Sequence, residues 1–284
     1  MEPVAAPAVR LPSFVIIGAM KSGTTSLGAY LTAHPDAYCA LEPHFFDSNF
    51  ERGLDWYRGY FRNAGDAAAV GEKSPSYMYH PLAIKRLAAT LPNAKLVAIL
   101  RHPVDRAYSH YWHERRLGHE TLSFGEALRA EPERLRASPP GHCRFAYMDR
   151  GLYLDQLQRV TSLVPRERLL VLLFDELDRE PARTFSSLCD FLGIEGSHVP
   201  ELVGERTNTY RTHRPESLWR AMQRYRLWRW LPAALARRLG RMMEREATYP
   251  DVEPAVRREL LDRFAAPNGA LEAWLGRDLD AWSF

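Results

Sequence analysis

The amino-acid sequence predicts an α/β protein with a three-layer, P-loop-like fold, in which helices and loops cover a central, mostly parallel sheet. Three observations lead to this prediction. Apolar runs at residues 14–17, 95–100 and 169–174 have the composition of strands that are buried on both faces. Segments with apolar residues at helical spacing lie between these runs, and a loop rich in glycine and threonine follows the first run. Strands that alternate with helices favour a parallel sheet with right-handed crossovers.

The first strand, loop and helix are predicted within the first 35 residues. The apolar run 14–17 ends at Gly18, and small residues follow it as far as Ser26. Apolar residues then recur at helical spacing until His34-Pro35 ends the pattern. Later helices are predicted at residues 81–90, 103–116, 153–163 and 181–192.

Two stretches interrupt the alternation of strands and helices. Residues 117–150 are rich in Arg, Gly, Pro and His, with a loop at Ser138-Pro-Pro-Gly141, and residues 206–250 contain eleven arginines. We expect both stretches to cover the carboxyl edge of the sheet, where α/β proteins bind ligands, although solvated surface is an alternative. Tryptophans among the arginines of 218–245 are compatible with a membrane-surface helix, but Pro232 interrupts it and we expect no peripheral membrane contact.

Length and composition set the remaining limits. We expect one domain over residues 1–284, with a flexible N-terminus at 1–12. The net charge of +3 and the motifs present give no reason to expect a nucleic-acid partner, whereas a positive cleft for an anionic small molecule is compatible with them. No apolar run approaches the length of a transmembrane helix, and we find no signal peptide. Three separated cysteines argue against a disulfide framework or zinc site, and we expect a cytoplasmic location. The oligomeric state is not legible in the sequence.

The loop after the first strand resembles a phosphate-binding loop with one departure. Gly18 and Gly23 are five residues apart and Thr25 occupies the hydroxyl position, but Thr24 stands where the Walker A pattern has lysine. Amide hydrogens at a helix N-terminus still converge on an anion after this change. Lys21, inside the loop, is placed to approach a phosphate or a bridging oxygen. A plain turn is the alternative interpretation.

A rival hypothesis is an ATP-dependent P-loop kinase. The run 169–174 is followed by Asp175-Glu176, which resembles a Walker B strand with its Mg²⁺-binding acid. The missing Walker lysine argues against it, and we prefer the interpretation that these acids cap the next turn. A nucleotide-binding module without turnover is a further hypothesis.

Four segments resemble sulfotransferases that use 3′-phosphoadenosine 5′-phosphosulfate (PAPS). Lys21-Ser-Gly-Thr-Thr-Ser26 is similar to the 5′-phosphosulfate loop of that family, and residues 100–111, with Arg101 and Ser109, are similar to its 3′-phosphate segment. Glu42-Pro-His44-Phe-Phe-Asp47 and Gly71-Glu-Lys73-Ser-Pro-Ser-Tyr77 resemble the carbohydrate branch, which includes heparan sulfate glucosaminyl sulfotransferases and bacterial counterparts. The four segments occur in the order and at the distances of that family, and the resemblance extends over roughly residues 13–284.

The resemblance implies transfer of a sulfuryl group from PAPS, without a metal, to a hydroxyl or amine of a carbohydrate or a glycosylated or small-molecule metabolite. It implies that 3′-phosphoadenosine 5′-phosphate (PAP) is the product. Glu42 is then the expected general base, with His44 as a competitor that we interpret as a packed histidine. Lys21 and Lys73 are expected at the transferring group.

The same resemblance assigns the nucleotide contacts. Arg101 and Ser109 are expected to hold the 3′-phosphate, with Tyr153 as a further nucleotide-side contact. Arg211 or Arg214 is expected to close over the nucleotide. The segment 208–215 lacks the Lys-Gly-Arg pattern and the nearby cysteines of extracellular-glycan enzymes, which favours a bacterial cytoplasmic protein. The 5′-phosphate would be held by Lys21, Ser22, Gly23, Thr24, Thr25 and Ser26.

Overall fold

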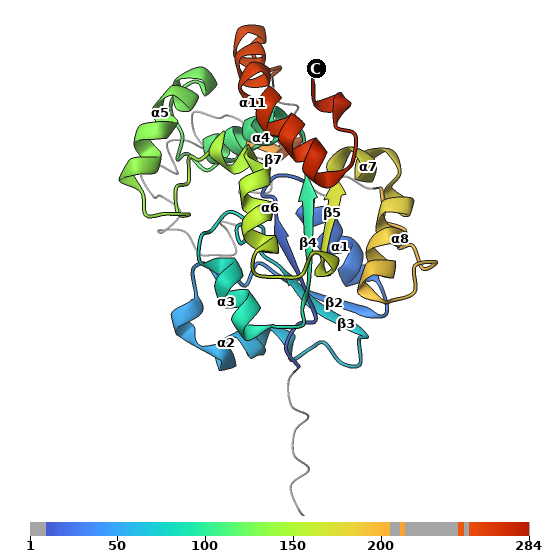
Figure 1. Cartoon of the computed structure of the whole chain (residues 1–284). Coiled ribbons are helices and arrows are strands. Elements are labelled where there is room, and N and C mark those ends of the chain that lie inside the picture. Colours follow the sequence, from blue (N-terminus) through green and yellow to red (C-terminus); the bar gives the residue numbers. More distant parts are fainter. Residues whose placement is uncertain (1–9, 205–210, 214–243, 247–249, 284) are drawn as a thin grey trace, which may run out of the picture.

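A five-stranded parallel sheet forms the centre of the protein (Figure 1). The computed structural model describes residues 10–204, 211–213, 244–246 and 250–283. The strand order is β2-β3-β1-β4-β5, and each neighbouring pair is parallel. The predicted parallel sheet is therefore confirmed. Its strands are β1 (Phe14–Gly18), β2 (Ala37–Leu41), β3 (Ala69–Lys73), β4 (Lys95–Leu100) and β5 (Leu169–Leu173).

Helices connect the strands and cover both faces of the sheet. Two of the predicted segments, 103–116 and 181–192, coincide with helices of the structure. The helices are α1 (Thr24–Ala33), α2 (Leu54–Arg58), α3 (Ala83–Thr90), α4 (Pro103–Arg116), α5 (Phe124–Ala137), α6 (Tyr153–Thr161), α7 (Phe174–Arg179), α8 (Pro181–Leu192) and α11 (Pro254–Leu275). A separate antiparallel pair joins β6 (Arg211–His213) to β7 (Glu244–Glu246). No described helix is both long enough and apolar enough to cross a membrane.

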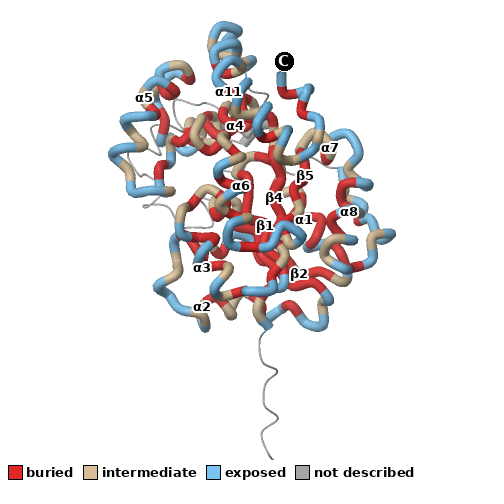
Figure 2. The backbone as a smooth tube through the Cα atoms, in the orientation of Figure 1, coloured by how far each residue is buried: buried red, intermediate tan, exposed pale blue. Residues whose placement is uncertain are grey.

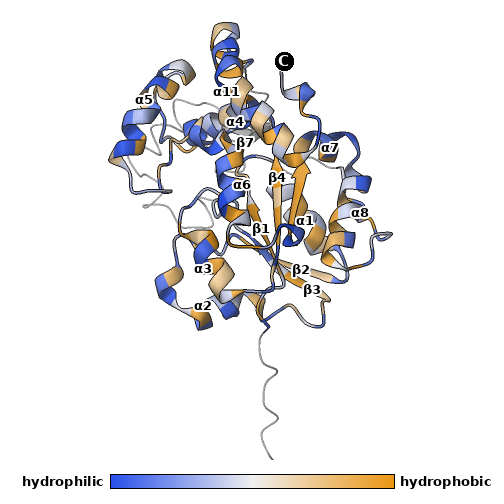
Figure 3. Ribbon diagram, viewed as in Figure 1, coloured by the Kyte–Doolittle hydropathy of each residue, from blue (hydrophilic) through white to orange (hydrophobic). Residues whose placement is uncertain are grey.

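Alternation along the strands divides the core into two layers of packing. Val15 and Ile17 of β1 belong to one buried cluster, together with residues of α3 and α6. Phe14 and Ile16 point to the other face and pack with residues of α1 and α8. Most strand residues are accordingly buried and apolar (Figures 2 and 3). The predicted three-layer arrangement is confirmed.

Strands β2 and β3 do not stand out in the sequence as apolar runs. β3 contains Glu72 and Lys73, which are nevertheless 0% and 2% exposed. Gly71 is required at its centre, because a Cβ atom there would lie 2.4 Å from the Phe14 ring on β1. The apolar-run criterion misses such a strand because its charged side chains are buried by partners elsewhere in the chain.

The stretch 117–150 contains a regular helix in addition to the expected loop. Ser123 and Glu126 form a capping box at the start of α5, and Pro132 lies within the helix. α5 contributes to a third buried cluster with α4 and α11. The other expected cover, 206–250, lies outside the described residues except for β6, β7 and residue 250.

The sheet topology places the predicted residues at one edge. The chain runs from β1 toward β2 and β3 on one side, then returns to β4 and β5 on the other. The loops after β1 and β4 therefore diverge at the carboxyl edge, where parallel sheets form ligand crevices.

Candidate functional site

The loop between β1 and α1 has the backbone geometry of an anion cradle. Gly23 precedes the helix with φ +95°, and a Cβ atom there would lie 2.9 Å from the Phe174 ring. Lys21 also has a positive φ of 70°. Amides in the first turn of a helix have no intrahelical acceptor and point toward any anion at its N-terminus. Thr24, Thr25 and Ser26 form this first turn.

Several cations surround this loop. The Arg101 guanidinium donates to the Lys21 carbonyl oxygen at 3.5 Å and lies over the Phe174 ring. Burial, followed by the charges of Arg116 and Arg101, lowers the pKa of Lys21 to about 8. Positive groups that together lower the pKa of a buried lysine create a site that favours an anion. The residues at the loop therefore fit a phosphosulfate group.

Lys73 joins the loop to the end of β2. Its ammonium donates to Glu42 Oε1 at 2.6 Å and to Thr25 Oγ1 at 3.5 Å. The Lys73 side chain is 3% exposed and that of Glu42 is 50% exposed. The position of Lys73 is fixed by the pairing of Leu41 with Lys73 in the sheet, and its stem passes close to Gly28 of α1. Lys73 is thus a buried cation at the carboxyl edge of the sheet, and its burial rules out the interpretation that it is an ordinary surface lysine.

Glu42 has an ionised carboxylate in this arrangement. Burial opposes its ionisation, but the hydrogen bond and charge of Lys73, with nearby His44 and His113, outweigh burial and lower the pKa of Glu42. Its backbone has φ +54°, and that of His44 has φ +50°. Left-handed conformations of residues other than glycine cost about 1–2 kcal/mol each, and strain of this kind is concentrated at functional sites.

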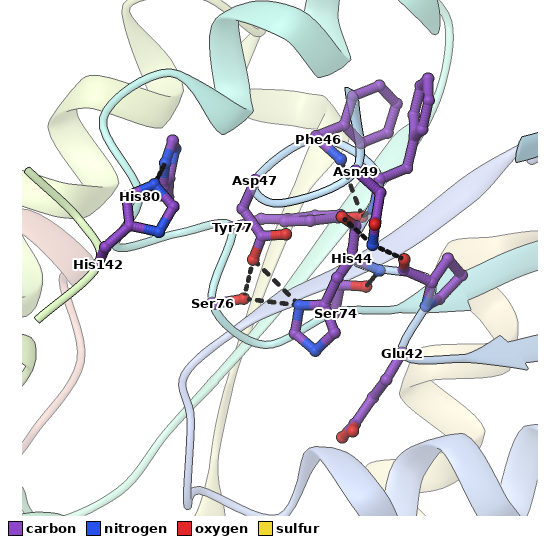
Figure 4. Close-up of polar contacts among 12 residues, drawn as sticks. Glu42, His44, Phe46, Asp47, Asn49, Ser74, Ser76, Tyr77, His80 and His142 are labelled. Carbon is purple, nitrogen blue, oxygen red and sulfur yellow. Dashed lines mark hydrogen bonds and ion pairs between the residues drawn. The ribbon is translucent and has the colours of Figure 1, made fainter. Parts of the chain in front are cut away.

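His44 forms a hydrogen-bonded pair with Asp47, and its role as packed histidine or competing base stays a prediction. The ring Nδ1 lies 3.0 Å from Asp47 Oδ2, and the His44 side chain is 34% exposed. Ser76 contacts both members of the pair (Figure 4). The hydrogen bond with Asp47 raises the pKa of His44, against the effect of burial. Asp47 engages Nδ1, which leaves Nε2 as the nitrogen that can exchange a proton with a ligand.

The remaining nucleotide-side predictions fall into two groups. Ser109 lies within α4, whose first residue follows Arg101 by two positions, and is 6% exposed. Tyr153 is 2% exposed and donates its hydroxyl to the Arg101 carbonyl oxygen at 2.8 Å. Tyr153 is therefore placed to orient the strand end that carries Arg101. Arg211 belongs to β6 without a described side chain, and Arg214 lies outside the described residues.

The structure adds residues that the motifs did not indicate. The C-terminal end of α4 brings His113, Glu114 and Arg116 near Lys21. The charges of Arg116 and Glu114 act on the pKa of Lys21, and the charge of Lys21 acts on the pKa of His113. Burial, followed by Lys21 and Arg116, lowers the pKa of His113 to about 4. Basic residues at a helix C-terminus are common for reasons of the helix dipole alone, so the sequence offered no distinguishing signal.

The segment 117–150 approaches the same edge from the side of β3. His142 lies 3.1 Å from His80 between the two Nε2 atoms, as drawn in Figure 4. A Cβ atom at Gly141, which has φ +79°, would lie 2.5 Å from Pro81. This close approach seats the loop beside the chain that follows Ser76. A role as a cover for an acceptor stays a prediction.

The two acids of the rival kinase hypothesis have other partners. Trp282 Nε1 donates to Asp175 Oδ2 at 2.8 Å, and Arg277 pairs with Glu176. Both acids lie in the first turn of α7, but neither forms a side-chain capping hydrogen bond there, so the capping interpretation is not borne out in that form. Nothing in their contacts favours a role beside the phosphate loop.

Comparison with known proteins agrees with these geometric findings. A family model described as Sulfotransferase domain matches residues 11–214. The human bifunctional heparan sulfate N-deacetylase/N-sulfotransferase 2 is 32% identical over 292 residues, which cover 96% of this chain and 31% of that protein. Mouse heparan sulfate glucosamine 3-O-sulfotransferase 6 is 34% identical over 190 residues, with 66% of this chain and 53% of that protein covered. The chain thus spans less than two thirds of the length of these relatives.

A solved structure extends the similarity over the whole fold. The crystal structure of a sulfotransferase from Alicyclobacillus acidocaldarius matches with a TM-score of 0.74 and 32% identity. The match covers 97% of this chain and 100% of that chain. The sequence resemblance and the predicted fold class are therefore confirmed.

Proposed function

The chain belongs to the sulfotransferase family, and we propose that it transfers a sulfuryl group from PAPS to a hydroxyl or amine of an acceptor. One observation carries this proposal. The Lys73 ammonium contacts both Thr25, at the start of α1, and the Glu42 carboxylate. A group able to accept a proton and a cradle able to hold a phosphosulfate therefore meet at one buried cation.

We assign the nucleotide-binding roles to the cationic loop. Lys21, Ser22 and Gly23, with the first-turn amides and hydroxyls of α1, hold the 5′-phosphosulfate. Lys21 stabilises the bridging oxygen as charge develops on the departing PAP. Arg101 takes the 3′-phosphate, supported by Ser109. PAPS supplies the sulfuryl group, and metal-free transfer stays a prediction.

Glu42 is the proposed general base. As the acceptor oxygen or nitrogen forms a bond to sulfur, the bond from sulfur to the bridging oxygen breaks and the acceptor proton passes to Glu42. The pKa of Glu42 is low while Lys73 is its partner. An anion that draws the Lys73 ammonium toward the loop weakens this ion pair and raises the pKa of Glu42, which makes the carboxylate a stronger base.

His44 is the alternative base, because Asp47 orients it and raises its pKa. In Figure 4 the Glu42 carboxylate and the outer edge of the His44 ring lie on the same side of the loop. Histidine is the side chain that most often serves as a general base. The two hypotheses are separated by substitution of each residue in turn.

The acceptor is proposed to be a carbohydrate or a glycosylated or small-molecule metabolite. This proposal is supported by the relatives, which are named as heparan sulfate enzymes.

The three cysteines are free and buried, which supports the expected reducing compartment.

The test is a PAPS-dependent screen over glycans and hydroxylated metabolites, followed by mass spectrometry. Glu42→Gln is expected to lower turnover by roughly 10²–10⁴-fold while PAP binding is kept. Glu51→Gln, on the exposed surface, is the matched control and should keep wild-type turnover. Wild-type turnover of Glu42→Gln together with loss in His44→Asn would transfer the role to His44.

Nucleotide binding distinguishes a sulfotransferase from a kinase and from a binding module without turnover. Thermal stabilisation by PAP without Mg²⁺ is expected from the proposed site. Selective stabilisation by MgATP would support a kinase instead. PAP binding with no transfer to any acceptor class would support a module without turnover.

A further inference from the structure

The buried carboxylate of Glu72 lies one residue before Lys73 and has no part in the roles assigned above. Three hydroxyls surround it: Tyr57 at 2.6 Å from Oε1, Ser74 at 2.7 Å from Oε2, and Tyr77 at 3.2 Å from Oε1. The residue is 0% exposed. Each hydroxyl has one proton, and an ionised carboxylate can only accept. Burial raises the pKa of Glu72 to about 7, and in its ionised form the carboxylate orients all three hydroxyl protons toward itself.

Two of these hydroxyls also accept hydrogen bonds from the loop that carries Glu42. The Ser74 hydroxyl accepts from the amide of His44 at 3.1 Å. The Tyr77 hydroxyl accepts from the amides of Phe45 at 2.7 Å and Phe46 at 3.3 Å. Figure 4 shows Ser74 and Tyr77 beneath this loop. Three consecutive amides thus donate to two hydroxyls, and Glu72 sets the direction of both hydroxyl protons.

The direction of these hydrogen bonds matters because the loop backbone is strained. Glu42 and His44 both have positive φ, and such conformations persist only where surrounding contacts over-determine them. A hydroxyl whose proton points to Glu72 presents its lone pairs to the loop amides. If the carboxylate became an amide, its N–H group would face a hydroxyl, and a buried proton would lose its acceptor.

We propose that Glu72 is a positioning residue, which acts through Ser74 and Tyr77 to hold the loop 42–47 and hence Glu42 and His44. The inference deepens the proposed function and rests on it for its effect on turnover. The expected effect of Glu72 on the loop conformation does not depend on which acceptor the protein uses. Tyr57 donates to the same carboxylate, but it contacts the loop through its ring, which stacks on Phe45.

The chain offers a matched pair of variants to test this inference. Tyr77→Phe and Tyr57→Phe each remove one buried hydroxyl from the same carboxylate, and both rings are 0% exposed. Hydrogen exchange of the peptide 42–48 is the first measurement. Tyr77→Phe should accelerate exchange of the amides of Phe45 and Phe46 by about tenfold or more, whereas Tyr57→Phe should change it by less than about twofold. Equal effects of the two variants would overturn the proposal.

Turnover is the second measurement, made with an acceptor from the screen. Tyr77→Phe and Glu72→Gln should lower kcat by about 10–100-fold while the Kd for PAP changes less than about twofold. In a Glu42→Gln background, Tyr77→Phe should have little further effect, because the group that it positions is already absent. Full additivity of the two substitutions would argue for a general loss of structure and against positioning.

The two proposals fail in different ways. If Glu42→Gln retains wild-type turnover, the proposed base is wrong, and the exchange measurement still decides whether Glu72 holds the loop. If Glu42→Gln is inactive but Tyr77→Phe leaves both exchange and kcat unchanged, the proposed function stands and the role of Glu72 is refuted. Circular dichroism and thermal unfolding check that each variant is folded.

Discussion

Lys21 gives the sharpest prediction, because its ammonium is expected to titrate within an accessible range of pH. Its pKa is lowered to about 8 by burial and by the charges of Arg116 and Arg101. The lysine is then about nine-tenths protonated at pH 7 and about one-tenth protonated at pH 9. His113, the neighbouring histidine, has a pKa of about 4 and stays neutral over this range.

The direction of the effect follows from the charge of the ligand. An anion stabilises the protonated lysine, so binding of PAP raises the pKa of Lys21 and takes up a proton. If only the ammonium form binds, the affinity for PAP falls about tenfold between pH 7 and pH 9, or about 1.4 kcal/mol. Isothermal titration calorimetry in buffers of different ionisation enthalpy measures both the affinity and the proton uptake.

Two variants make this prediction specific. Lys21→Arg stays charged up to about pH 12 and should bind PAP with an affinity that is nearly constant between pH 7 and pH 9. Lys85→Arg, on the exposed side of α3, should retain the wild-type dependence. An affinity of the wild-type protein that does not change with pH, or an unchanged slope in Lys21→Arg, would refute the reasoning.

Two further predictions concern the nucleotide site. Arg101→Met should weaken PAP binding by about 10–100-fold, as expected for loss of a charge-assisted contact. Binding of adenosine 5′-phosphosulfate should stay nearly unchanged, because that ligand lacks the 3′-phosphate. Equal losses for both ligands in a binding titration would show that Arg101 does not contact the 3′-phosphate. Gly23→Ala should lower both the Tm and the affinity for PAP, because its φ is +95° and the new methyl group would lie 2.9 Å from an aromatic ring. Gly59→Ala, at a right-handed position with φ −52° and no atom within 4 Å of the added methyl group, should be tolerated, and a similar loss of Tm in both variants would contradict this account.

Local patterns were sufficient for much of the architecture. The apolar runs at 95–100 and 169–174 correspond to β4 and β5, because a strand covered on both faces needs apolar side chains at nearly every position. The run that begins at Phe14 likewise marks β1. Since parallel strands end at one edge, the loops after these runs had to lie near one another. The sequence therefore indicated where a site would form before any contact was known.

β3 shows where local patterns fail. Its residues Glu72 and Lys73 are buried charged groups, and each is tolerated only because its partners come from other segments. Three hydroxyls donate hydrogen bonds to Glu72, among them that of Tyr57, and Glu42 pairs with Lys73. No window of sequence around residue 72 contains the Tyr57 and Glu42 partners, so no propensity or periodicity argument predicts this strand.

The amino-acid sequence by itself determined the chemistry available to this protein: a glycine-containing loop before a helix, lysines at positions 21 and 73, and a carboxylate at position 42. The tertiary structure alone decided how these groups act on one another. It buries Lys73 against Glu42 and orients His44 on Asp47. It also brings Arg116 close to Lys21, although Arg116 and Lys21 lie far apart in the sequence. The physical reason is that pKa values and strained backbone conformations depend on desolvation and on charges at short distance, and folding sets both.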